Sequence, residues 1–214
     1  MIGLIRVLTT DDMQVLHAHG RIIAEKYEVP VKNTCIPDQP LGIYNDETEA
    51  AAFPKIVELG KQLEQEGCKV LVVSCAADPA VELLRKEVKA PVIGAGSAAA
   101  YMARAIGKTV GVIGIMRTAP TVITDILGES FIGYLQPEGV SNTTDLLSPT
   151  GSEKAILAAR ALVEQGAEAL LFACTGLSTI GLADVLRKEL SVPVIDAVEA
   201  EGLLAAHVYK QLNR

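Results

Sequence analysis

Two cysteines occupy matching places in the two halves of the chain. Cys75 follows the apolar, β-branched segment 70–74, and Cys174 follows a similar apolar segment. Such segments are typical of strands buried on both faces of a parallel sheet, where ligands bind at the carboxyl ends of the strands. A thiol there faces the positive end of the next helix, so we expect it to ionise more readily than its reference pKa of about 8.5 allows.

Two thiols that face each other across a cleft suit the inversion of a carbon α to a carbonyl group. One thiolate removes a proton from one face of the stereocentre, and the opposing thiol returns a proton to the other face. The residues just after the cysteines, Ala76, Ala77, Thr175 and Gly176, carry backbone N–H groups that could hold a carboxylate or another oxyanion.

The elements that position these cysteines follow from the alternation of apolar runs with amphipathic segments. This alternation is typical of an α/β protein with parallel sheets covered by helices. We expect strands over residues 2–8, 29–35, 70–74, 91–93 and 109–115. We expect the first helix to end near residue 27, and further helices over 50–66, 78–88 and 97–106.

The second half of the chain repeats the first. Leu71 corresponds to Leu170, and Cys75 to Cys174. The opening strands also correspond, and so do the short segments Pro91-Val92-Ile93 and Pro193-Val194-Ile195. Segments that repeat in sequence are expected to fold into similar structural units. The sequence therefore predicts two similar parallel-sheet α/β domains related by pseudo-twofold symmetry.

Three segments carry a resemblance to a known family. The first is Val72-Val73-Ser74-Cys75-Ala76-Ala77-Asp78-Pro79, the second is Phe172-Ala173-Cys174-Thr175-Gly176, and the third runs from Gly111-Val112-Ile113 to Arg117-Thr118. Together they resemble the aspartate/glutamate/hydantoin racemase superfamily, and the first segment is most similar to its hydantoin racemase-like members. The resemblance implies a cofactor-independent racemase that uses Cys75 and Cys174 as acid and base.

The same resemblance implies how the chain divides. The first domain would comprise residues 1–96 together with a returning C-terminal helix, 197–214, and the second domain residues 97–196. The active site would lie in the cleft between them.

Candidate substrate-binding residues surround the cysteines in this scheme. Thr118 occupies the place of a substrate-contacting threonine of the family, and Thr10 is its counterpart in the repeat, although both also fit ordinary helix caps. Asp78 fits equally well as an N-cap before Pro79, and Tyr44 either lines the mouth of the cleft or lies exposed on its loop. The full set is Thr10, Tyr44, Ala76, Ala77, Asp78, Arg117, Thr118, Thr175 and Gly176.

Departures from the family pattern favour one substrate class. Aspartate and glutamate racemases carry Asn-Thr after the first cysteine and Thr-His after the second, whereas this chain has Ala76-Ala77 and Thr175-Gly176. These small residues suit a hydantoin ring, which has no ammonium group, better than a free amino acid. The alternatives are an aspartate or glutamate racemase, an enzyme similar to arylmalonate decarboxylase or maleate isomerase, and a small-molecule binding or regulatory protein on the same fold.

Other residues that could do chemistry have simpler interpretations. Cys35 and Cys68 lack repeat partners and are expected to pack in the core. The run from Gly94 to Ala99 fits a dinucleotide fingerprint, but no acidic residue follows at the required distance, so we expect tight packing and no NAD. No metal site is expected either. The histidines are expected on the surface of outer helices, and they are His17, His19 and His207.

The amino-acid composition disfavours some classes of binding partner. A net charge of -7 without a cluster of basic residues disfavours nucleic acid. Half of the residues are hydrophobic and only 4% are aromatic, yet no uninterrupted apolar stretch suits a membrane span, and the N-terminal residues do not resemble a signal peptide. We therefore expect a cytoplasmic homo-oligomer whose partner is a small molecule with a carbonyl or carboxylate group.

Overall fold

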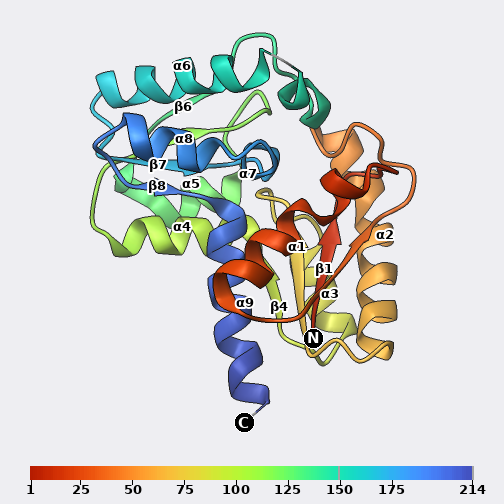
Figure 1. The fold of residues 1–214 in the computed structure, drawn as a ribbon. Coiled ribbons are helices and arrows are strands. Elements are labelled where there is room, and N and C mark those ends of the chain that lie inside the picture. Colours follow the sequence, from red (N-terminus) through yellow and green to blue (C-terminus); the bar gives the residue numbers. More distant parts are fainter. Residues whose placement is uncertain (149, 214) are drawn as a thin grey trace.

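Two four-stranded parallel sheets form the framework of the computed structural model, which describes residues 1–148 and 150–213 (Figure 1). The strand order is β2-β1-β3-β4 in the first sheet and β6-β5-β7-β8 in the second. The strands are β1 (Ile2–Arg6), β2 (Val31–Cys35), β3 (Val70–Ser74), β4 (Val92–Gly94), β5 (Val110–Ile113), β6 (Phe131–Leu135), β7 (Ala169–Phe172) and β8 (Val194–Ile195). This arrangement confirms the predicted α/β class.

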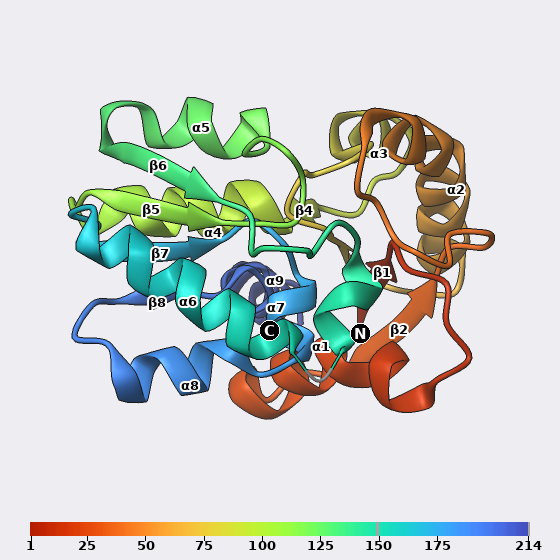
Figure 2. The ribbon, with the colours of Figure 1, turned by 90° about the horizontal axis from the view of Figure 1, so that it is seen from above.

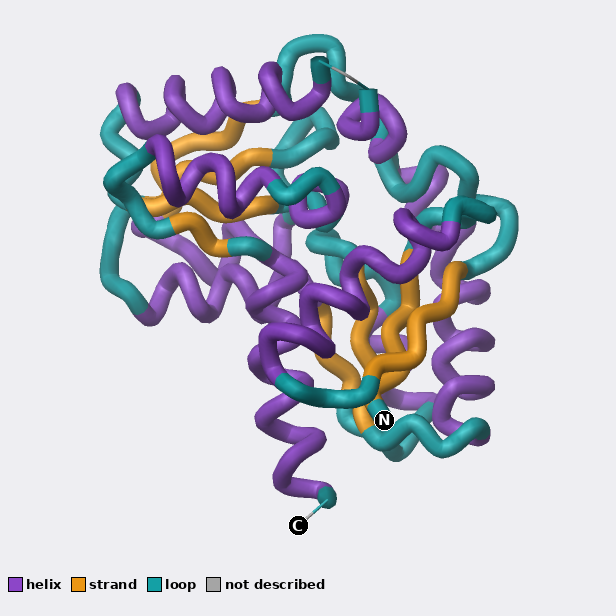
Figure 3. Tube along the Cα trace, viewed as in Figure 1, coloured by secondary structure: helices purple, strands orange, loops and turns teal. Residues whose placement is uncertain are grey.

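Helices cover both faces of each sheet (Figure 3). They are α1 (Met13–Tyr27), α2 (Asp46–Gln65), α3 (Val81–Glu87), α4 (Ala95–Ala105), α5 (Thr121–Leu127), α6 (Gly151–Glu164), α7 (Gly176–Thr179), α8 (Leu182–Glu189) and α9 (Ala197–Leu212), with short 3-10 helices η1 (Gly128–Ser130) and η2 (Thr143–Leu147). None of the described helices combines the length and the apolar character that crossing a bilayer requires.

The pairing of β1 with β3 decides which side chains face which helices. Leu4 lies beside Val72 and packs toward α1 and α9, whereas Ile5 lies beside Val73 and packs toward α2 and α3. Side chains alternate between the two faces of a strand. Arg6 and Ser74, the next pair in register, therefore point toward α1 and α9.

Helix α9 joins the two sheets. It begins just after β8 of the second sheet and packs against α1, α4 and β3, and from above it stands between the sheets (Figure 2). The limits expected for the two domains, 1–96 with 197–214 and 97–196, remain predictions.

The segment after β3 differs from the expected helix over 78–88. Helix α3 begins only at Val81, because Asp78 and Ala80 have left-handed backbones with φ of 53° and 56°. The carboxylate of Asp78 instead accepts the N–H groups of Gly96 and Ser97 at 2.6 and 2.9 Å. Asp78 therefore caps the first turn of α4, and the prediction that it caps the helix following it is wrong.

The glycine-rich turn before α4 has the packing role expected of it. A side chain at Gly96 would collide with the carbonyl oxygen of Ala76, and one at Gly94 would collide with the carboxylate of Asp78. Glycine is therefore required here for the close approach of the β3 and β4 ends.

Candidate active site

Both cysteines lie at the carboxyl ends of central strands. Cys75 follows β3, and its sulfur accepts the backbone N–H of Ala77. Cys174 lies two residues beyond the end of β7, and its sulfur accepts the N–H groups of Gly176 and Leu177. The two residues are nearly equally buried, with exposed fractions of 9% and 8%.

The thiols are harder to ionise than the sequence predicts. Burial raises the pKa of Cys174 to about 11, although the two N–H groups and the charge of Arg6 act in the opposite direction. Burial raises the pKa of Cys75 still further, and a negative charge on Cys174 adds to that rise. The prediction of easier ionisation is wrong because loss of hydration outweighs the backbone hydrogen bonds. The effect of a charge on Cys174 on the ionisation of Cys75 indicates that the two side chains lie within electrostatic range of one another.

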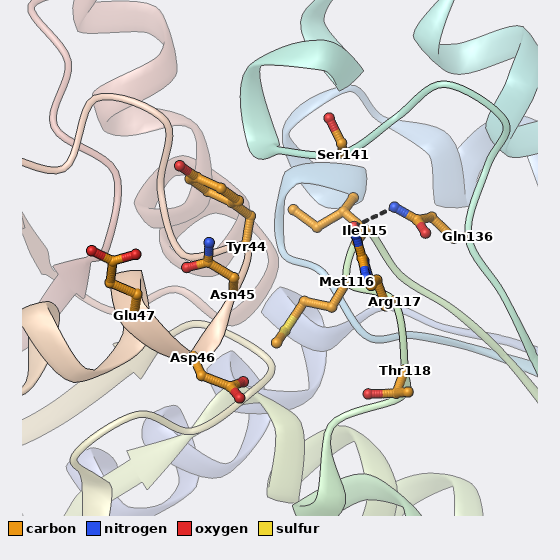
Figure 4. Close-up of a pocket in the computed structure, with 10 residues that line it drawn as sticks. All are labelled: Tyr44, Asn45, Asp46, Glu47, Ile115, Met116, Arg117, Thr118, Gln136 and Ser141. Carbon is orange, nitrogen blue, oxygen red and sulfur yellow. Dashed lines mark hydrogen bonds between the residues drawn. The ribbon is translucent and has the colours of Figure 1, made fainter.

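A cleft of about 640 Å³ opens between the start of α2 and the segments after β5 and β6 (Figure 4). Tyr44 lies on one wall, and Arg117 and Thr118 lie on the other. The Met116 side chain extends from the second wall toward the segment that carries Asp46 (Figure 4). The cleft thus brings together three of the candidate residues, from both halves of the chain.

The cysteines do not line this cleft, but one of its walls leads to Cys174. The Tyr134 hydroxyl donates to the carbonyl oxygen of Met116 at 2.7 Å. Burial raises the pKa of Tyr134, and a negative charge on Cys174 raises it further, which indicates that the two side chains are close. Substrate in the cleft would therefore need to extend inward past this wall to meet the sulfurs.

The remaining candidate residues lie elsewhere. Thr10 lies outside the cleft, with its hydroxyl accepting the N–H of Asp12 at 3.1 Å. The side chain that caps α1 belongs to Asp12, and α5 begins after Pro120 without a bond from Thr118, so neither threonine caps its helix. The alternative that Thr10 and Thr118 are helix caps is therefore wrong.

The residues that follow the cysteines do not form one binding surface. Ala76 is buried against α4, while Ala77 and Asp78 line a different hollow of about 430 Å³ beside α4 and α5. Thr175 is buried, and its hydroxyl donates to the carbonyl oxygen of Ser74 at 3.2 Å. The N–H of Gly176 already donates to the sulfur of Cys174.

Four buried polar residues beside the cysteines escaped the sequence reasoning. His19 was expected on the surface, but its side chain is fully buried between the sheet and α7, so that prediction is wrong. Arg6, Ser74 and Glu201 are also buried. The sequence contained one signal for this burial, because the charged residues Arg6 and Glu201 each lie between apolar neighbours.

The fold and the paired thiols define a two-part α/β protein with matching cysteines at two strand ends. Residues 2–201 match the family model described as Asp/Glu/Hydantoin racemase, and the chain belongs to this family. Membership supports a racemase, an isomerase acting on a small molecule, in agreement with the resemblance read from the sequence.

Individual relatives agree with this assignment. A hydantoin racemase of Rhizobium meliloti is 31% identical over 205 residues, which cover 90% of this chain and 80% of that protein. One of Pseudomonas sp. (strain NS671) is 29% identical over 170 residues, or 75% of this chain and 66% of that protein, just under two thirds of its length. The structure of allantoin racemase from Klebsiella pneumoniae superposes with a TM-score of 0.83 and 24% identity, covering 99% of this chain and 88% of that one.

Proposed function

We propose that the protein is a cofactor-independent racemase that inverts a carbon α to a carbonyl, with Cys75 and Cys174 as acid and base. The observation that carries this proposal is the pair of buried thiols, each at a strand end and each accepting at least one backbone N–H. Such a pair can hold one proton between two sulfurs, which is what a two-base inversion requires.

The reaction balances with one thiolate and one thiol. A thiolate on Cys174 takes the α-proton from one face, leaving an enolate-like carbanion, and Cys75 gives its proton to the other face. The product leaves with Cys174 protonated and Cys75 ionised. The opposite enantiomer uses the same groups in reverse. Arg6 lowers the pKa of Cys174, and its own pKa, lowered by burial to about 10, keeps it charged at neutral pH, so Cys174 is the thiol that ionises more readily.

We propose a hydantoin-type ring as the substrate. Such a ring carries no ammonium group, so it needs no charged partner beside Cys75 and Cys174, where this chain has alanines and a glycine. Thr118 and Arg117 in the cleft wall offer hydrogen-bond donors to ring carbonyl oxygens. Two relatives named hydantoin racemase support the same class.

The experiment that tests the proposal is α-proton exchange in deuterated water. A panel of 5-substituted hydantoins, free aspartate and glutamate, and an arylmalonate is incubated with the enzyme after dialysis against a chelator. We expect deuterium incorporation together with loss of optical rotation for hydantoins. Exchange confined to amino acids, or release of carbon dioxide from the malonate, would instead favour an alternative enzyme, and no exchange at all a binding protein.

Variants of the two thiols sharpen the test. Cys75→Ser and Cys174→Ser should each abolish racemisation, and each should spare α-proton exchange for one enantiomer only, because the remaining thiol faces one side of the carbon. Cys68→Ser is the matched control, since Cys68 is buried beneath the first sheet and takes no part in the proposed reaction. Equal exchange of both enantiomers in either catalytic variant would contradict the two-base scheme.

Assembly and location extend the proposal. We propose a homo-oligomer, supported by apolar side chains exposed along α4 and α9, among them Tyr101, Leu203 and Leu204. Light scattering of the purified protein tests it. A reducing compartment such as the cytoplasm would keep the two thiols usable, and the net charge of -7 disfavours nucleic acid as a partner.

A further inference from the structure

A chain of hydrogen bonds runs through the interior on the α1 and α9 side of the first sheet. Ser74 donates to Oε1 of Glu201 at 2.5 Å, and Nδ1 of His19 lies 2.8 Å from the Ser74 oxygen. Nε2 of His19 lies 2.9 Å from the hydroxyl of Thr179. His19 and Glu201 are fully buried, and Ser74 is 1% exposed.

This chain joins the loops that carry the two cysteines. Ser74 directly precedes Cys75 at the end of β3, and Thr179 lies in α7, which follows Cys174. The hydroxyl of Thr175 adds a second link, because it donates to the carbonyl oxygen of Ser74 at 3.2 Å. The contacts therefore connect the first sheet, α1, α9 and the second cysteine loop through one buried path.

Burial shifts the pKa of both titratable members of the chain. Burial raises the pKa of Glu201 well above its ordinary value, and Asp78 and Asp196 raise it further, while the bond from Ser74 and the charge of Arg6 oppose the rise. Burial lowers the pKa of His19, and Arg6 lowers it further, against the backbone carbonyl of Thr175. Burial therefore favours the neutral form of both side chains.

The contacts fix the order of the groups in the chain, and the imidazole tautomer decides the order of the protons. The Ser74 oxygen lies between Oε1 of Glu201 and Nδ1 of His19, and Nε2 of His19 lies beside the hydroxyl of Thr179. That hydroxyl also donates to the carbonyl oxygen of Thr175 at 3.5 Å. Oε2 of Glu201 has no hydrogen-bond partner among the described residues.

We propose that His19 and Glu201 are positioning residues that, through Ser74 and Thr179, hold the two cysteine loops at the separation that inversion needs. The inference rests on the proposed function only in taking both cysteines as the reacting groups. Buried polar groups cost stability unless they are bonded. Hydrogen bonds of Ser74, Thr179 and Glu201 hold the two cysteine loops in defined positions. Apolar side chains could fill the same space, but they would not fix the orientation of the loops.

The test removes single hydroxyls. Thr179→Val keeps the shape of the side chain but removes the hydroxyl that contacts His19, and Ser74→Ala breaks both bonds of the serine. A displacement of about 1 Å can cost on the order of a hundredfold in rate. We therefore expect kcat for hydantoin racemisation to fall roughly tenfold in Thr179→Val and roughly 10- to 100-fold in Ser74→Ala, with KM changed less than about threefold.

Matched variants separate positioning from general loss of structure. Thr179→Ser keeps the hydroxyl, and we expect it to retain kcat within about twofold. Thr124→Val removes a hydroxyl that bonds only within α5 and should leave kcat unchanged. Circular dichroism melting checks that each variant is folded. Loss of activity in Thr179→Ser equal to that in Thr179→Val would overturn the proposal.

Glu201→Gln tests the neutral state. Glutamine is uncharged and keeps a carbonyl oxygen that can accept the Ser74 hydroxyl, so we expect kcat within about twofold and an unchanged pH profile of kcat. An ionised Glu201 would give a different result. Its removal would take a negative charge away from the thiols and move the alkaline limb of the profile to lower pH. Such a shift, or a fall in kcat beyond about tenfold, would overturn the inference.

A measurement without substrate separates this inference from the proposed function. The rate at which diamide oxidises Cys75 and Cys174 to a disulfide reports how freely the two sulfurs can approach each other. Peptide mass spectrometry follows the formation of this disulfide. We expect oxidation at least about threefold faster in Ser74→Ala and Thr179→Val than in the wild type and Thr179→Ser. Equal rates would overturn the positioning role. Absence of hydantoin turnover in the wild type would overturn only the proposed function.

Discussion

The two thiols should differ in reactivity although they are equally buried. Their exposed fractions are 9% for Cys75 and 8% for Cys174, so access does not separate them. Their pKa values do, because burial raises both but Cys174 only to about 11, helped by two N–H groups and Arg6. At pH 8 only about one Cys174 side chain in a thousand is then a thiolate.

Iodoacetamide alkylation measures this directly, because the thiolate is the reacting form. Between pH 8 and 10 the rate at Cys174 should rise about tenfold per pH unit and stay ahead of the rate at Cys75. Peptide mass spectrometry separates these sites from Cys35 and Cys68. In Cys174→Ser the rate at Cys75 should stay within about a tenth of its wild-type value at pH 10, since only about one Cys174 in ten then carries the charge that opposes ionisation of Cys75.

Removing the charge of Arg6 should act on Cys174. Arg6→Met raises the pKa of this thiol, and a higher pKa also makes the thiolate more nucleophilic, so each pKa unit appears as only about a threefold slower reaction. Arg6→Lys keeps a cation and should react at nearly the wild-type rate. Faster alkylation of Cys75 than of Cys174, or no effect of Arg6→Met, would refute the electrostatic reasoning.

Three further outcomes test the fold and the cleft. Gly96→Ala should lower the free energy of unfolding by about 2 kcal/mol or more, measured by urea denaturation, because its Cβ collides with the Ala76 carbonyl. Asp78→Ala should cost about 1 kcal/mol through loss of the α4 cap, and an unchanged KM would show that Asp78 does not bind substrate. Thr118→Val should raise KM for a hydantoin by roughly tenfold through loss of one hydrogen bond, with Thr118→Ser as control; an unchanged KM would remove Thr118 from the site.

Periodicity and repetition predicted the framework well because both depend on local pattern. The segment 70–74 is apolar and β-branched, and β3 has those bounds. The segment after Cys75 was harder. A helix from residue 78 looks reasonable locally, but the Asp78 carboxylate bonds to Gly96 and Ser97, far along the chain, and its left-handed backbone delays the helix.

The buried polar chain lay beyond sequence reasoning for the same reason. Ser74 and Glu201 are 127 residues apart in the sequence, and His19 and Thr179 are 160 apart. Histidine is intermediate between buried and exposed residue types, so its place on an amphipathic helix does not reveal its burial. His19 is buried because α9 and α7 pack against α1, and neither contact can be recognised from the residues near His19 in the sequence.

The two halves of the chain place their cysteines alike but surround them with different residues. Symmetry of the backbone supplies two equivalent strand ends, each with a thiol. The residues that modify the thiols break that symmetry, because Arg6 corresponds to Gly114 and Ser74 to Ala173 in the second half. A cation beside Cys174 and a hydrogen-bond network behind Cys75 therefore make two similar cysteines chemically unequal. For a reaction that must be able to start from either enantiomer, this inequality sets which thiol loses its proton more readily.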